Sequence, residues 1–173
     1  TATSAPAGKT GLAPTATLKD VGGNTIVSGP HANATISISI SGTDGTIVSG
    51  ATASTVNGVA SFPNLVLGGK VNTNYTLTFS VTFQDTQSQS VTVTEDEVVT
   101  LTFGDASKVT LGAATQTVAN RTNLANIVAT VRDAYDNVVT NSTAAVALSF
   151  GAGATLAESA VVTGYSAQNA IAG

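Results

Sequence analysis

The chain has no cysteine, no methionine and no tryptophan, and it has a single histidine among its 173 residues. Without cysteine there is no disulfide bond, no thiolate metal site and no cysteine nucleophile, so stability must come from packing and from hydrogen bonds between strands. No apolar run approaches the roughly 20 residues that a membrane-spanning helix needs. We therefore expect no insertion into a membrane.

Charge is also scarce. Charged residues make up 9% of the chain, against roughly 25% in an average soluble domain. The six basic residues lie singly along the chain and the net charge is −4, so neither nucleic acid nor an anionic membrane is an expected partner. The chain has 29 threonines and 16 serines instead. Such a neutral, hydroxylated surface has little charge repulsion to keep copies apart, which favours self-association or a coat of sugar.

Apolar and hydroxyl-bearing residues alternate along several segments, which is the period of a half-buried β-strand. Ile36, Ile38 and Ile40 alternate with threonine and serine in the first of these. The same pattern recurs at 74–83, 97–103 and 144–150. No window has the 3.6-residue stripe of an amphipathic helix. The pattern predicts an all-β fold.

Turn signals separate these segments at the short spacing of an all-β protein. They are DVGGN (20–24), TDG (43–45), VNG (56–58), LGGK (67–70) and DAYDN (133–137). Together they predict roughly seven strands before residue 104. The apolar faces of these strands predict a core built on Phe62, Leu65, Leu77, Phe79 and Phe103.

One segment conflicts with a continuous strand. Val91 and Val93 have the same parity as the apolar residues that follow at 99–103. A single strand through both would place Glu95 and Glu97 on the apolar face, because side chains alternate between the two faces of a strand. We therefore expect the strand to break at 94–97.

One sequence motif, called here the repeated phrase, occurs twice, as ATLKDVGGNTIVS at 16–28 and as ATVRDAYDNVVT at 129–140. The alignment pairs Asp20 with Asp133 and Asn24 with Asn137. We interpret the copies as one supersecondary unit used twice, in which the aspartate caps a turn and the asparagine takes the left-handed conformation. The second copy lacks both glycines of the first. We place the junction between the two units near 104–107.

Three segments resemble a known family. LKDVGGNTIVSG, TVNGVASFPNLVL and YTLTFSV are similar to the strand B turn, a hairpin and a core strand of bacterial immunoglobulin-like repeats. Those repeats build invasin- and intimin-type adhesins, S-layer proteins and other surface fibres. The resemblance implies an immunoglobulin-like antiparallel β-sandwich, with one complete module at 1–104 and a partial second module at 105–173.

The second module contains no counterpart of the strands built on Phe62, Phe79 and Phe103. An open half of a sandwich would expose apolar faces and unpaired strand edges. We therefore expect that further chain, or a strand from a neighbouring subunit, completes it. The extended segment 1–9 is the candidate donor of that strand.

A weak calcium site is the main candidate for a metal centre. Glu95, Asp96 and Glu97 are consecutive acids, and Ca²⁺ takes roughly six to eight oxygen ligands. The alternative interpretation is a solvated hairpin turn. Asp133 with Asp136 is a weaker version of the same idea, against which turn capping is the simpler explanation. No other cofactor is expected.

Four N-glycosylation sequons occur, at Asn33, Asn74, Asn120 and Asn141. In a chain so rich in serine and threonine, chance alone produces roughly three. The sequons are candidate sites of glycosylation, and their number adds nothing to that hypothesis.

Nothing in the sequence assembles a catalytic site. His31 follows Pro30 in a loop, and no serine, histidine and aspartate grouping can be built around it. We therefore expect no enzyme. The predicted function is a structural module or subunit of an extracellular prokaryotic cell-surface assembly, such as an S-layer, stalk or fibre, partnered by its own copies or by further repeats. Two alternatives stay open, an adhesin module that binds a glycan or protein and an accessory domain of a secreted enzyme.

Overall fold

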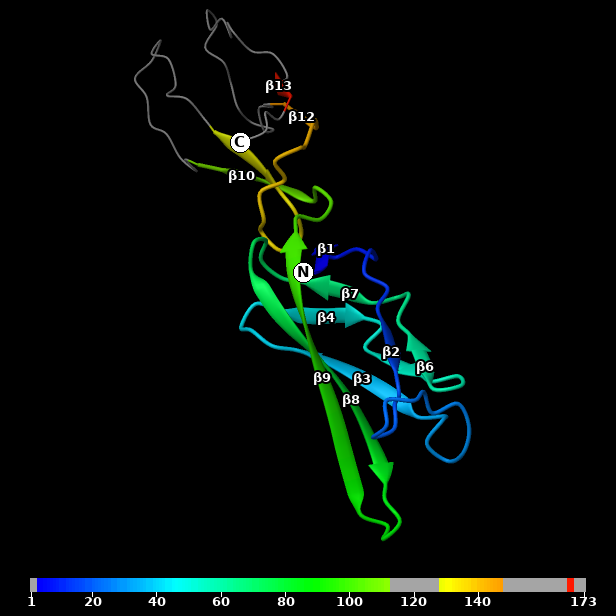
Figure 1. The fold of residues 1–173 in the computed structure, drawn as a ribbon. Coiled ribbons are helices and arrows are strands. Elements are labelled where there is room, and N and C mark those ends of the chain that lie inside the picture. Colours follow the sequence, from blue (N-terminus) through cyan, green and yellow to red (C-terminus); the bar gives the residue numbers. More distant parts are fainter. Residues whose placement is uncertain (1–2, 113–127, 148–167, 170–173) are drawn as a thin grey trace, which may run out of the picture. The chain divides into compact units, whose positions relative to one another are not determined.

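The computed structural model describes residues 3–112, 128–147 and 168–169, which form only strands, turns and loops (Figure 1). Within these ranges there is no helix, and hence none that could cross a membrane. The chain divides into two compact units, Thr1–Gly104 and Asp105–Gly173. The all-β class that the alternation predicts is confirmed for the described residues.

The first unit has nine strands rather than about seven, because several short strands lie between the turn signals. They are β1 (Thr3–Pro6), β2 (Thr15–Thr17), β3 (Thr35–Ile40), β4 (Thr46–Ser49), β5 (Thr52–Ser54), β6 (Val59–Ser61), β7 (Val66–Gly68), β8 (Asn74–Gln84) and β9 (Ser90–Thr102). Five of them form a curled sheet in the order β1-β9-β8-β3-β5. Two antiparallel ribbons, β2 with β6 and β4 with β7, complete the unit.

The N-terminal strand pairs within its own unit. β1 runs parallel to β9, with Thr3 opposite Val99 and Pro6 opposite Thr102, whereas the other pairs of this sheet are antiparallel. Ala5 of β1 is only 2% exposed. The expectation that segment 1–9 is donated to a neighbouring subunit is therefore wrong for residues 3–6, because these residues already fill a place in their own sheet.

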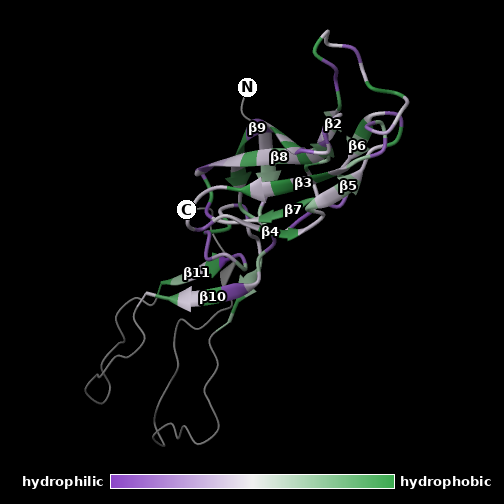
Figure 2. Ribbon diagram, turned by 90° about the horizontal axis from the view of Figure 1, so that it is seen from below, coloured by the Kyte–Doolittle hydropathy of each residue, from purple (hydrophilic) through white to green (hydrophobic). Residues whose placement is uncertain are grey.

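Alternation explains how the core forms. Along β3 and β8 apolar residues alternate with hydroxyl-bearing ones (Figure 2), and most of the apolar side chains are buried whereas those between them are half-buried or exposed. Phe62, which follows β6, packs edge-on against Phe79 of β8 with ring centroids 5.7 Å apart. Leu65 and Leu77 are fully buried. Four of the five predicted core residues are therefore confirmed, but Phe103 follows the end of β9 and is only half-buried.

Tyr75 is a packing residue, as its place on an apolar face predicts. Its side chain is 1% exposed, and its hydroxyl accepts a hydrogen bond of 2.8 Å from the backbone N–H of Lys70. A Cβ atom on Gly45 would lie 2.7 Å from the tyrosine ring, and one on Gly69 would lie 2.6 Å from the hydroxyl. These two positions must be glycine for the ring to fit.

The expected break at 94–97 is wrong. β9 continues through all 13 residues from Ser90 to Thr102, and its register sets Glu95 opposite Phe79 and Glu97 opposite Leu77. The carboxylates are tolerated because β9 is an uncovered edge here: β1 pairs with it only from Val99 onward, and nearly every residue of β9 before Val99 is exposed. The valines at 91 and 93 are 44% and 53% exposed. Along this uncovered edge, the alternation of side chains no longer decides which of them are buried.

The phrase DVGGN forms a tight turn organised by one carboxylate. The backbone N–H of Asp20 donates to the carbonyl of Asn24 (2.9 Å), and that of Gly23 donates to the carbonyl of Asp20 (3.0 Å). The carboxylate of Asp20 accepts from both the backbone N–H and the side-chain amide of Asn24. These bonds, the backbone one first, hold the pKa of Asp20 below its ordinary value of 3.8.

The phrase DAYDN forms the same turn in the second unit. The N–H of Asp133 donates to the carbonyl of Asn137 (2.9 Å), and that of Asp136 donates to the carbonyl of Asp133 (3.3 Å). Oδ1 of Asp133 accepts from the N–H of Asn137 (2.9 Å). The bond that closes each copy also matches, from Ile26 to Leu18 and from Val139 to Val131, both 3.0 Å. The repeated phrase therefore predicts a repeated structure correctly.

The left-handed residue is not the asparagine, contrary to expectation. Gly23 has φ +84° and Asp136 has φ +67°, and neither Asn24 nor Asn137 is among the residues of positive φ. The asparagine stabilises the turn through its side-chain amide instead: Nδ2 of Asn137 donates to Oδ2 of Asp133 (2.9 Å). The left-handed residue closes a three-residue loop that begins with a turn and ends in a bulge.

Aspartate replaces glycine at the left-handed position of the second copy. Aspartate is one of the few side chains that visits this region with a small penalty. Asp136 is also fastened on two sides, since Nζ of Lys108 lies 2.7 Å from its Oδ1 and Nη1 of Arg132 donates to its carbonyl (2.7 Å). These contacts account for a turn that keeps its shape without either glycine.

A third turn of the same kind, which the sequence reasoning missed, joins β8 to β9. Asp85 donates its N–H to the carbonyl of Gln89 (2.9 Å), and its Oδ1 accepts from the N–H groups of Gln87 and Gln89 (2.8 Å each). Ser88 takes the left-handed conformation with φ +60°. An aspartate followed four residues later by asparagine or glutamine is the shared signal of all three turns.

The second unit has four strands among its described residues. β10 (Lys108–Leu111) pairs with β11 (Ala129–Arg132), and β12 (Ala145–Val146) pairs with β13 (Gln168–Asn169), both antiparallel. β12 begins the strand predicted at 144–150, and the residues from 148 onward lie outside the described ranges. The completion of this module by further chain or by a strand from a neighbouring subunit stays a prediction.

Candidate functional site

The acidic run at 95–97 does not converge on one point. It lies in the middle of β9, where alternation sends Glu95 and Glu97 to one face and Asp96 to the other. Oε1 of Glu97 accepts from the hydroxyl of Thr3 (2.9 Å), and Oδ1 of Asp96 accepts from that of Thr78 (2.6 Å). The run is neither a hairpin turn nor a set of ligands gathered around one ion.

No group of three or more histidine, aspartate or glutamate side chains in the described residues is arranged to hold a metal ion. The weaker pair, Asp133 and Asp136, belongs to the turn described above. There the carboxylate of Asp133 accepts hydrogen bonds from the backbone N–H of Tyr135 and from the backbone N–H and side-chain amide of Asn137. Hydrogen bonds within the chain thus account for the carboxylates of Asp96, Glu97 and Asp133.

The sequons lie in different settings. Asn33 is exposed in the loop before β3, and Asn141 is exposed in a turn of the second unit. Asn74 begins β8, and its Oδ1 accepts from the hydroxyl of Thr100 (2.7 Å). Asn120 lies outside the described residues. Glycosylation of any of them stays a prediction.

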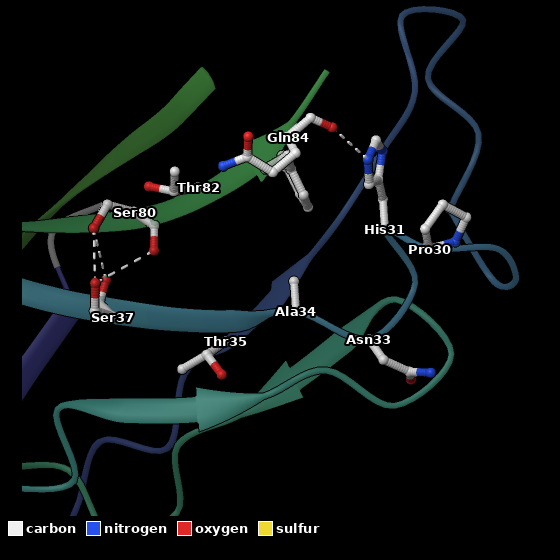
Figure 3. Close-up of a pocket in the computed structure, with 10 residues that line it drawn as sticks. Pro30, His31, Asn33, Ala34, Thr35, Ser37, Ser80, Thr82 and Gln84 are labelled. Atoms are coloured by element: carbon white, nitrogen blue, oxygen red, sulfur yellow. Dashed lines mark hydrogen bonds between the residues drawn. The ribbon is translucent and has the colours of Figure 1, made fainter. Parts of the chain in front are cut away.

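His31 is half-buried and makes two contacts with the end of β8. Its Nε2 lies 3.2 Å from the carbonyl oxygen of Gln84, to which it must donate because a carbonyl only accepts. Its ring also packs against Phe83, with centroids 4.8 Å apart and planes tilted by 40°. The single histidine thus ties the loop before β3 to the far end of β8 (Figure 3).

A pocket of about 560 Å³ opens beside this tie. Its lining comes from the loop and start of β3 on one side and from the end of β8 on the other (Figure 3). The residues are Pro30, His31, Asn33, Ala34, Thr35, Ser37, Ser80, Thr82, Phe83 and Gln84. The lining contains no carboxylate, ammonium or guanidinium group, so the site is polar and carries little charge.

The pocket exists because two strands part. The β3–β8 ladder runs from Ile40–Leu77 to Ser37–Ser80 and stops there. Ile36 with Val81 and Thr35 with Thr82 would be the next two pairs of the register, but neither forms, although on its other edge β3 still pairs with β5, with Thr35 opposite Ser54. The gap that this leaves is spanned only at its end, by the bond from His31 to Gln84 described above.

The floor of the pocket is made of hydroxyl groups. Ser37 and Ser80 face each other with their Oγ atoms 2.9 Å apart, and Thr82 pairs in the same way with Thr92 of β9 (2.9 Å). The serines therefore pair with each other, and the one bond of the imidazole goes to a backbone carbonyl. This arrangement can bind a ligand through hydrogen bonds and ring packing.

Comparison of the chain with protein-family models, with curated proteins and with solved structures finds no match in any of the three.

Proposed function

We propose that this chain is a load-bearing structural part of an extracellular prokaryotic surface assembly, built from immunoglobulin-like β-sandwich modules in tandem. The recurrence of one turn in two consecutive units supports a tandem arrangement. The hydroxyl-rich, weakly charged composition suits a surface outside the cell.

The observation that carries the proposal is the pairing of the first strand with the last. β1 begins at Thr3 near the N-terminal end of the unit, and β9 ends at Thr102 near its C-terminal end. The two strands are parallel. Tension applied through the chain pulls β1 toward its start and β9 toward its end, which are opposite directions along one axis.

This geometry loads the β1–β9 hydrogen bonds together. Bonds that lie across the direction of pull share the load, whereas bonds at the end of a hairpin would be broken one by one. The N–H of Ala7 donates to the carbonyl of Thr102 (2.9 Å) and extends the ladder by one bond. A unit closed in this way resists extension without a disulfide bond.

Single-molecule pulling of the full chain from its two ends tests the mechanical part. Unfolding of the unit Thr1–Gly104 should give a discrete force peak and release roughly 30–35 nm of chain, at about 3.4 Å for each residue. Ala5→Pro should lower the peak force strongly, because proline donates no hydrogen bond to the ladder and Ala5 is buried.

Ala53→Pro is the matched control. Ala53 lies in β5, the opposite edge strand of the same sheet, where it faces Ile36 of β3. This variant has the same substitution outside the β1–β9 pair, so its peak force should fall less than that of Ala5→Pro. An equal fall in both variants, or a wild-type chain without a peak, would refute the load-bearing role. Immunogold labelling of intact source cells tests location, and label confined to opened cells would contradict an extracellular assembly.

A further inference from the structure

The pocket beside His31 plays no part in the load-bearing role, and we propose that it binds a short neutral saccharide. It lies where β3 and β8 part, away from the β1–β9 pair at the other side of the sheet. The two proposals therefore rest on different residues and can fail separately.

The charge and chemistry of the lining favour a sugar. Of the side chains around the pocket, four carry hydroxyls and two carry amides, and none is a carboxylate, an ammonium or a guanidinium. Hydroxyls and amides both donate and accept, as the hydroxyls of a sugar do. A phosphate, an acidic peptide or a metal ion would find no opposite charge here, and a neutral polyhydroxylated ligand needs none.

The parted strands add backbone groups to this lining. The carbonyl of Thr76 accepts from the N–H of Ser41 and that of Gln84 accepts from His31, so the even residues of β8 direct their backbone groups toward β3. Thr82 has the same parity. Its N–H and C=O therefore face the gap, as do those of Thr35 from the other side, beyond the last pair of the ladder. Backbone groups so placed are strong hydrogen-bonding partners for a ligand.

The rings of His31 and Phe83 supply an apolar surface at one end of the pocket. The tilted pair is held by the bond from Nε2 of His31 to the carbonyl oxygen of Gln84. An apolar ring surface beside convergent polar groups is the usual composition of a small-molecule site. The volume of about 560 Å³ lies within the roughly 300–1,000 Å³ of such sites, which suits a disaccharide.

An inserted peptide strand is the competing ligand, and the geometry disfavours it. A strand needs a run of free backbone groups, but the gap offers only the pair Thr35 and Thr82 before the carbonyl of Gln84 is taken by His31. A ligand that places several hydrogen-bonding groups within one sugar ring uses such a short gap better.

The test is an NMR titration of the full ¹⁵N-labelled chain, produced without N-glycosylation so that Asn33 is unmodified. The probes are cellobiose, maltose and N,N′-diacetylchitobiose, each raised to about 20 mM because a shallow site of this kind corresponds to dissociation constants on the order of 1 mM. At least one probe should give saturable shifts at the amides of Thr35 and Thr82 and at the imidazole of His31.

Variants assign the binding to the pocket. The double variant Ser37→Ala with Ser80→Ala removes the hydroxyl pair of the floor, and His31→Ala removes the ring; each should weaken binding at least about fivefold. Ser39→Ala is the matched control, because Ser39 is an exposed serine on the same face of β3 but outside the lining. Its affinity should equal that of the wild-type chain.

Three results would overturn the proposal. The first is the absence of saturable shifts with all three probes. The second is a set of shifts centred elsewhere, or an affinity that the pocket variants leave unchanged. The third is tighter binding of the neutral peptide acetyl-Thr-Thr-Thr-amide at the same residues, which would make the gap a site for peptide strands.

Discussion

Replacement of Phe79 by alanine should destabilise the first unit by about 3–5 kcal/mol, the usual cost of truncating a buried phenylalanine. The side chain is 9% exposed and packs edge-on against Phe62. A buried phenylalanine removes roughly 150–250 Å² from water, which at about 25 cal/mol per Å² corresponds to about 4–6 kcal/mol. The alanine methyl group retains part of this, while the lost edge contact adds to the cost.

Phe83→Ala is the matched comparison. Phe83 lies on the same face of the same strand, four residues nearer the hairpin tip, and is only half-buried. Its truncation should cost about 1–2 kcal/mol, in proportion to the smaller area that it buries. The difference between the two variants measures where along β8 the core ends.

The assay is urea unfolding of the full chain, followed through the NMR intensities of amides in β3 and β8. These signals report the first unit alone, so the second unit does not enter the free energy of unfolding. A cost below about 1 kcal/mol for Phe79→Ala would refute its place in the core. Equal costs for both variants would refute the conclusion that the hairpin leaves the core before Phe83.

Two further predictions concern the aspartate-led turns. Ser88→Gly should stabilise the first unit by about 0.5–1 kcal/mol, because glycine adopts the left-handed conformation without the penalty that serine has. Gly23→Ala, at the equivalent position of another turn, should destabilise the unit by about 1–2 kcal/mol. The same urea assay measures both changes, and a change of the same sign in both variants would contradict the shared turn geometry. Because the pKa of Asp20 is lowered in the folded state, mainly by the N–H of Asn24, its ionised form contributes stability above the ordinary value of 3.8 that is lost as the pH falls below it. The stability gap between the wild-type chain and Asp20→Ala should therefore narrow between about pH 6 and about pH 3, and a constant gap would show that the carboxylate bonds do not couple to folding.

Local patterns in the sequence predict local structure well here. The alternation at 35–40 and 74–83 gives β3 and β8 with the correct buried faces, because both strands are covered on one side only. The spacing of Asp20 and Asn24 predicts their turn, because its hydrogen bonds join residues four apart. Asp85 and Gln89 have the same spacing, but neither a glycine nor a second copy of the motif marks their turn in the sequence.

What the sequence could not supply are features that depend on distant partners. The acids of β9 break the alternation but not the strand, since β1 leaves this part of β9 as an uncovered edge whose side chains are mostly exposed. The pairing of β1 with β9 joins the two ends of the unit, and no local pattern in 1–9 encodes it. The pocket arises from the end of a ladder between β3 and β8, which depends on the course of both strands together.

The acidic residues at 95–97 lie on the part of β9 whose outer edge has no neighbouring strand. β1 covers this edge only from Val99 to Thr102, and no other described strand of the unit pairs with it from Ser90 to Val98. If two copies aligned these edges antiparallel about Asp96, each Glu95 would meet a Glu97 and the two Asp96 side chains would meet each other. Like charges placed opposite oppose such pairing, so the acids act as guards against edge-to-edge aggregation. Replacement of these acids by neutral residues would remove that repulsion and leave the exposed Val91 and Val93 free to recruit a second chain.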